Sequence, residues 1–194
     1  MNYGETLAYW YLRLNGFFPL RDFVHHMPDD RNARADCDLL AIRFPHVTED
    51  IGGAPGDWDA ARFEGWGLPL AHPIALIVQV KTGTRTGHGE AFGQPRVKAA
   101  LERVGLWPPG VVAPLARDLG RAACTAGPHD TRVAKLLIAS SPCSHPEVHL
   151  SMLMGDAVAF IRRRFQRYRD PKAADRLLFN DELIQFLASR EDQP

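Results

Sequence analysis

Residues 74–81, Ile-Ala-Leu-Ile-Val-Gln-Val-Lys, are the stretch that decides the fold. Five of the first seven are Ile, Leu or Val, a composition typical of a strand buried on both faces of a sheet. Strand side chains alternate between faces, so Gln79 and Lys81 share one face, roughly 6–7 Å apart along the strand. A lysine at the end of a core strand needs an anion or must leave the core. The identity of that anion is therefore the main question that the sequence raises.

The composition predicts one domain spanning residues 1–194, long enough to bury a core. Lys plus Arg and Asp plus Glu both total 23, so the net charge gives no general attraction to nucleic acid, and any such site must be a local patch. The opening MNYGETLAYW does not resemble a signal peptide, and no run of 18 apolar residues exists. We therefore expect a soluble, cytoplasmic protein that does not enter a membrane.

Cysteine and histidine spacing argues against a zinc or disulfide protein. The three cysteines, Cys37, Cys124 and Cys143, are odd in number and widely spaced, which suits a reducing compartment. None of the eight histidines has the spacing of a compact zinc site. Cys143-Ser144-His145 lacks a context that would activate the thiol. No glycine-rich nucleotide-binding motif is present.

The first half of the chain predicts one helix and three strands. Asn2 is a good helix N-cap with Glu5 three residues later, and Asn15-Gly16 is typical of a helix end. Strands follow over 17–26, 37–44 and 74–81. The connection over 45–73 is rich in Gly, Pro and acid, and so long a connection is usually functional or mobile. The sequence leaves open whether this insert gates a site, mediates dimerisation or repels polyanions.

The second half predicts helices around two more strands. A helix is expected from about residue 90 to 104, although Pro95 makes its start uncertain, and a short helix over 111–123. Strands are expected over 133–139 and 148–152, then three helical pieces opened by Asp156, Asp170-Pro171 and Asn180-Asp181.

Three predicted elements carry the candidate catalytic residues: Glu5 is on the first helix, Asp38 is at the start of the second strand, and Gln79-Val80-Lys81 ends the third strand. This order resembles the PD-(D/E)XK, or restriction-endonuclease-like, nuclease superfamily. The glutamine form of the tripeptide resembles the Mrr-like branch with a QxK motif. Residues Gly4-Glu5, Tyr11-Leu12 and Gly16-Phe17 are similar to that branch and to archaeal Holliday-junction resolvases. The resemblance covers about residues 1–140, leaving out the insert and the strand and helices over 147–190.

The resemblance implies an α/β fold with a restriction-endonuclease-like core, in which a central mixed sheet of αβββαβ order is flanked by helices. It also implies a metal-dependent endonuclease that hydrolyses DNA phosphodiester bonds in restriction, phage defence or repair. Such domains often act as homodimers or as subunits of a larger assembly.

The family pattern also implies a role for each residue. Asp38 is the principal ligand of Mg²⁺ (or Mn²⁺), beside the Val80 backbone carbonyl and the Gln79 amide oxygen, with Glu5 reaching in from the helix. Magnesium prefers one or two carboxylates plus waters, which fits this set. Lys81 orients the attacking water and offsets phosphate charge, and cleavage leaves a 5′-phosphate.

Each of these residues also has a purely structural explanation. Glu5, three residues after Asn2, fits the N-terminal cap of a helix. Asp38 fits the first residue of a strand without any chemical role. Lys81 fits a lysine that extends from the end of a strand into solvent. Gln79 is neutral where the commoner pattern has an acid, so an inactive nuclease-fold module that binds nucleic acid or partner proteins is the alternative function. An unrelated α/β protein is a further one. Asp36, on the same strand face as Asp38, is a secondary candidate.

Two groups of cations are candidates for contacting DNA. Arg85, Arg96 and Lys98 lie close in sequence to the Gln79–Lys81 strand, as does His88. A second group of arginines fits either a solvated helix face or contact with the phosphate backbone: Arg162, Arg163, Arg164, Arg167 and Arg169.

Overall fold

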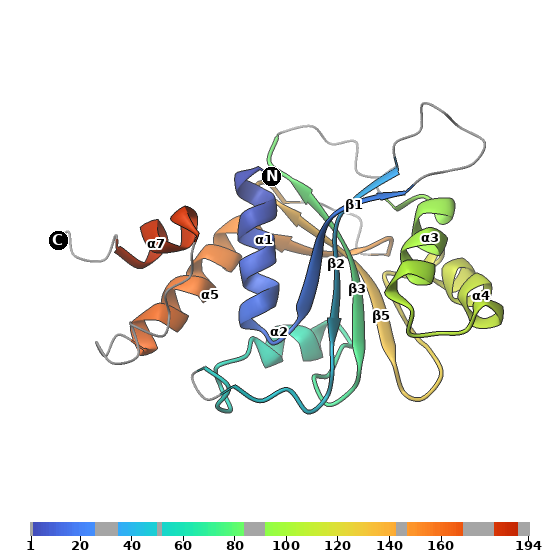
Figure 1. The fold of residues 1–194 in the computed structure, drawn as a ribbon, viewed down its shortest axis with the longest axis horizontal. Coiled ribbons are helices and arrows are strands. Elements are labelled where there is room, and N and C mark those ends of the chain that lie inside the picture. Colours follow the sequence, from blue (N-terminus) through green and yellow to red (C-terminus); the bar gives the residue numbers. More distant parts are fainter. Residues whose placement is uncertain are drawn as a thin grey trace.

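The computed structural model describes residues 2–25, 35–49, 52–83, 92–142, 147–168 and 181–189. The elements within these ranges, drawn in Figure 1, are α1 (Tyr3–Leu14), β1 (Phe18–His25), β2 (Ala35–Arg43), α2 (Ala60–Gly65), β3 (Ile74–Lys81), α3 (Gln94–Val104), α4 (Pro109–Leu119), β4 (Cys124–Ala126), β5 (Arg132–Ala139), β6 (Leu150–Leu153), α5 (Met154–Arg167) and α7 (Glu182–Ser189).

The strands form one mixed, six-stranded sheet. Its order is β1-β2-β3-β5-β4, with β6 also pairing β5. The pairs β1–β2, β2–β3 and β4–β5 are antiparallel, whereas β5 is parallel to β3 and β6 is parallel to β5. The crossover from β3 to β5 passes through α3 and α4. The expected α/β architecture with a mixed central sheet flanked by helices is confirmed.

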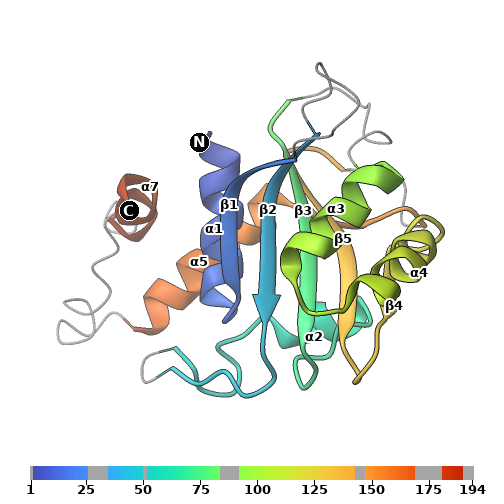
Figure 2. The same cartoon turned by 45° about the vertical axis from the view of Figure 1, so that its right-hand side comes forward.

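Helices cover both faces of this sheet. Figure 1 shows α1 and α5 on one side, with α3 and α4 on the other, and Figure 2 shows the strands between them. The two faces of β3 feed two apolar clusters: Leu76 and Val78 pack with α1 and α5, and Ala75 and Ile77 with α3 and α4. All of β3 except Lys81 is buried, as its composition predicts.

Two helices differ from their predicted limits. The helix expected over 90–104 begins at Gln94 as α3, because Pro95 occupies its first turn, where a missing N–H breaks no helical bond. The helix expected over 111–123 begins earlier, at Pro109, and ends at Leu119 as α4. The chain then turns into β4, a three-residue strand that the sequence analysis missed and that pairs with the start of β5.

The C-terminal helices show one wrong and one correct boundary. Helix α5 begins at Met154, directly after β6, so Asp156 lies in its first turn and does not cap it. Helix α7 begins at Glu182, and the Asp181 carboxylate accepts hydrogen bonds from two backbone amides of its first turn, which confirms that predicted start. Asp170-Pro171 lies outside the described residues. No helix among the described residues is both long and apolar enough to span a bilayer.

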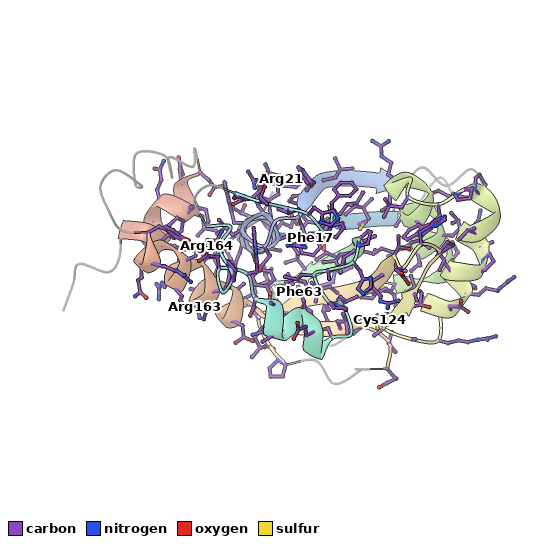
Figure 3. All side chains as sticks on the ribbon, turned by 90° about the horizontal axis from the view of Figure 1, so that it is seen from below. Phe17, Arg21, Phe63, Cys124, Arg163 and Arg164 are labelled. Carbon is purple, nitrogen blue, oxygen red and sulfur yellow. The ribbon has the colours of Figure 1, made fainter. Side chains whose placement is uncertain are left out.

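The described part of the insert over 45–73 is held by charge and hydrogen bonds to α1 and α5. The Tyr11 hydroxyl of α1 donates to the Asp59 carboxylate at 2.9 Å, while Asp57 is buried and paired with Arg167 at 3.0 Å. Helix α2 adds Phe63, which packs against Phe17 with ring centroids 5.3 Å apart (Figure 3). These acids therefore serve in docking the insert onto the core.

Arg164 is the centre of this docking and not part of a solvated face. It is 6% exposed and donates to the backbone carbonyls of Gly52 and Asp57. Its guanidinium also lies 5.3 Å from the ring centroid of Trp58. Arg163, one residue earlier, is exposed and stays available to solvent (Figure 3). The arginines of α5 thus divide between structural and surface roles, and Arg169 lies outside the described residues.

Replacing Arg164 by Met should lower the free energy of unfolding by about 3 kcal/mol, because two buried carbonyls of the insert lose their charged donor. Arg163→Met is the matched control on the same helix and should cost less than about 1 kcal/mol. Urea denaturation of both variants measures the difference. Equal losses would show that Arg164 does not hold the insert.

Lys135 is a buried cation in the middle of β5. It is 1% exposed, and its ammonium donates to the carbonyl of Leu119, the last residue of α4, where the helix dipole favours positive charge. The Phe92 ring centroid lies 5.9 Å away. Burial nevertheless lowers the pKa of Lys135 from its ordinary 10.5 to about 8, because desolvation penalises the charged form.

This lowered pKa predicts a stability that rises with pH. Below about pH 8 the folded protein bears the full cost of the buried charge; between about 8 and 10.5 the unfolded chain binds more protons, so folding becomes more favourable as pH increases. The gain should be on the order of 3 kcal/mol across that window. Lys135→Met should lack it, and the difference between wild type and variant in urea melts at several pH values isolates the effect. Parallel pH profiles for the two proteins would contradict the assignment.

Candidate functional site

Asp38 lies where the pairing of β2 with β3 ends. The last paired residues at this end are Leu39 and Val78. One step further, the Asp38 carboxylate accepts a hydrogen bond from the backbone N–H of Val80 at 2.6 Å. The Asp38 side chain thus accepts the hydrogen bond that a backbone carbonyl of β2 would accept if the β2–β3 pairing continued. This bond places an acid beside the end of β3.

Strand β2 is irregular at this point. Leu39 and Ala41 pack on the α1 side of the sheet, as alternation requires, but Cys37 joins Leu40 on the α3 and α4 side. The Cys37 thiol contacts the Leu39 carbonyl at 3.1 Å, and burial raises its pKa to about 12. It therefore stays protonated at neutral pH and is neither a nucleophile nor a ready metal ligand.

Gln79 and Lys81 share the α3 and α4 face of β3. They alternate with Val80, which belongs to the cluster beneath α1. Gln79 is 4% exposed, while Lys81 is half-buried at the end of the strand. The Lys81 carbonyl accepts from the Ser140 N–H at 3.0 Å, which fixes the end of β3 to the end of β5. The structure thus brings Asp38, Gln79, Val80 and Lys81 together at one end of the sheet.

Glu5 reaches the same end of the molecule from the other face. Figure 1 shows the start of α1 beside the end of β3. Gly4 makes this approach possible, because a Cβ there would lie 2.6 Å from a Thr82 methyl and 2.9 Å from a Val80 methyl. A larger residue at position 4 would force the side chains of Val80 and Thr82 to shift.

The Glu5 carboxylate is engaged in a capping box with Asn2. It accepts from the Asn2 backbone N–H at 3.2 Å, and the Glu5 N–H donates to the Asn2 side-chain oxygen at 3.0 Å. The interpretation of Glu5 as part of a helix cap is therefore confirmed. A role at Asp38 requires Glu5 to leave this box.

The oxygen donors at the end of β3 are of the kind that Mg²⁺ takes. A carboxylate, an amide oxygen and a backbone carbonyl come from Asp38, Gln79 and Val80, and a magnesium ion completes such a set with waters. Among the described residues, no group of three or more His, Cys, Asp or Glu side chains is placed to hold a metal. Within the described residues, this donor set would hold an ion through the single carboxylate of Asp38.

The other candidates are spread more widely. Lys98 is exposed on α3 and pairs with Glu102 at 3.0 Å, and Arg96 lies half-buried on the same helix. Asp36 pairs with Val24 through the backbone, but its side chain is outside the described part of the structure. Arg85, His88 and Cys143-Ser144-His145 also lie outside the described residues.

The sequence analysis did not predict a cavity that lies close to the end of β3. A cavity of about 160 Å³ opens at the ends of β5 and β6 and the start of α5, with a lining that includes Ala139, Ser141, Ser151, Leu153 and Asp156. Its signal in the sequence is weak: a serine just past one predicted strand and another within the next.

Comparisons with protein-family models, with curated proteins and with solved structures find no match to this chain. The geometry at the end of β3 is therefore the basis for assigning a function.

The capping box predicts how two conservative changes differ. Glu5→Gln should leave the free energy of unfolding within about 0.5 kcal/mol, because a glutamine at this position also accepts from the N-cap amide. Asn2→Ala removes the side-chain cap and should cost about 1 kcal/mol. Thermal or urea denaturation measures both. A Glu5→Gln loss larger than that of Asn2→Ala would mean that the negative charge of Glu5 has a partner beyond Asn2.

Proposed function

We propose that this protein is a metal-dependent endonuclease with a restriction-endonuclease-like core that cleaves DNA. The hydrogen bond from the Val80 amide to the Asp38 carboxylate carries the proposal, because it sets an acid beside Gln79-Val80-Lys81. The connectivity supports it: apart from α2 in the insert and the short β4, a helix, three strands paired antiparallel, a helical crossover through α3 and α4 and a parallel strand follow the αβββαβ order.

Each residue of the site has a chemical task in this proposal. Asp38, the Gln79 amide oxygen and the Val80 carbonyl would hold Mg²⁺ or Mn²⁺, which would supply Lewis-acid stabilisation of the phosphate and a more acidic water. The Lys81 ammonium, at the open end of β3, offsets charge on the phosphate and orients the attacking water. Glu5 is an auxiliary acid, available only when it leaves Asn2.

DNA contact in this proposal is local, because the chain has no net charge. Arg96 and Lys98 lie on α3, which covers the face of the sheet that bears Gln79 and Lys81. They would position the phosphate backbone without reading sequence. Restriction, phage defence or repair is the setting, with a second copy or a larger assembly providing further DNA contacts.

A second candidate is a nuclease-fold module without activity that binds DNA or partner proteins. Two observations favour it: Gln79 adds no charge to the site, and Glu5 is occupied by the capping box. Asp38 then remains only because it satisfies the Val80 amide. The two candidates differ in what the charge of Asp38 does.

Asp38→Asn separates these roles, because asparagine keeps an oxygen for the Val80 N–H but carries no charge. For an active nuclease, plasmid cleavage with Mg²⁺ or Mn²⁺ should fall at least about 100-fold in Asp38→Asn and in Lys81→Ala. The unfolding free energy of Asp38→Asn should change by less than about 1 kcal/mol, whereas Asp38→Ala should lose about 1–3 kcal/mol. Arg121→Ala, which alters an exposed cation after α4, is the control and should cleave like wild type.

Cleavage that survives both Asp38→Asn and Lys81→Ala would rule out this mechanism. Wild-type protein that binds DNA but never cuts it, with either metal, would favour the inactive module. Preparing all four variants and the wild type identically excludes a contaminating nuclease as the source of activity.

A further inference from the structure

The cavity at the ends of β5 and β6 begins at the strand next to Lys81. Lys81 pairs with Ala139 across the parallel ladder, and Ala139 pairs with Leu153 on β6. Neighbouring strands are about 4.8 Å apart, so the cavity begins one strand from Lys81 and extends to about 10 Å from it. A group bound there is within reach of a nucleotide whose phosphate sits at Lys81.

The walls of the cavity suit an uncharged ring more than a phosphate. Hydroxyl groups come from Ser141 and Ser151, and apolar surface from Ala139, Met152 and Leu153. Asp156 adds a carboxylate, which pairs with Arg62 at 3.2 Å. None of the described residues that line the cavity is a lysine or an arginine. An anion would meet the Asp156 carboxylate there, whereas a base would find donors, acceptors and apolar contact.

We infer that this cavity, of about 160 Å³, binds the base of the nucleotide next to the cleaved phosphate, and that the substrate is therefore DNA with an unpaired nucleotide at that position. A base inside a continuous duplex is stacked and paired, so it enters a pocket only when it is flipped out at a cost of a few kcal/mol. Single strands, flaps and junctions avoid that cost. The inference rests on the proposed nuclease site, because it uses Lys81 as the position of the phosphate.

Ser151→Phe and Ser141→Phe test the inference by filling the cavity from two of the segments that line it. Both positions are exposed, on β6 and just after β5, so either variant keeps the buried core intact. Ser151→Ala is the control that leaves the cavity open. Binding is measured by fluorescence anisotropy in EDTA, with a labelled 20-base single strand, a flap of the same sequence and its blunt duplex. Because no metal is present, the measurement does not depend on cleavage.

Wild type should bind the single strand and the flap at least tenfold more tightly than the duplex. Both phenylalanine variants should lose that preference and bind duplex within twofold of wild type, while Ser151→Ala changes the preference less than threefold. Equal wild-type affinity for all three DNAs, or phenylalanine variants that keep the preference, would overturn the cavity assignment. Plasmid cleavage that still depends on Asp38 and Lys81 would then show that the nuclease proposal stands without it; wild type that neither binds nor cuts overturns both.

Discussion

The structure depends on the burial of β3. A strand covered by helices on both faces has no water to satisfy its backbone, so every N–H and C=O must find a partner inside the protein. β5 provides partners along the whole of one edge, but β2 pairs only as far as Leu39 and Val78. The Asp38 carboxylate meets the remaining need at Val80. Asp38, the candidate metal ligand, thus also satisfies a backbone N–H of the central strand.

Because Asp38 has this structural role, its presence alone is weak support for catalysis. The presence of both Asp38 and Lys81 at the same end of the sheet is stronger support. Asp38 alone has a sufficient structural reason to be present. Lys81 does not, because it extends past the buried part of β3 and its backbone, not its side chain, ties the strand to Ser140. The location of both residues at one end of the sheet is what gives the proposed function its physical basis.

Sequence reasoning succeeded where local signals were strong. The burial of β3, the cap at Asn2 and the start of α7 at Asp181 follow from composition and capping chemistry, and the structure has all three. It failed where tertiary contacts decide. The residues of β4 are too few to show a period, and they form a strand only because β5 offers an edge. The positions of Asn2 and Glu5 predict the capping box. They do not show whether the Glu5 carboxylate points toward Asp38 or toward Asn2.

The arginines of α5 show the same limit, and they bear on how the proposed nuclease would bind DNA. In the sequence they resemble a basic patch, yet Arg164 is buried against the insert and Arg167 neutralises Asp57. Much of the positive charge on this helix is therefore already compensated within the protein. With no net charge on the whole chain, counterion release offers little general affinity for duplex DNA. Recognition by the proposed nuclease would then draw on shape and on contact with bases, for which the cavity near Lys81 offers hydroxyl groups and apolar surface but no described lysine or arginine in its lining.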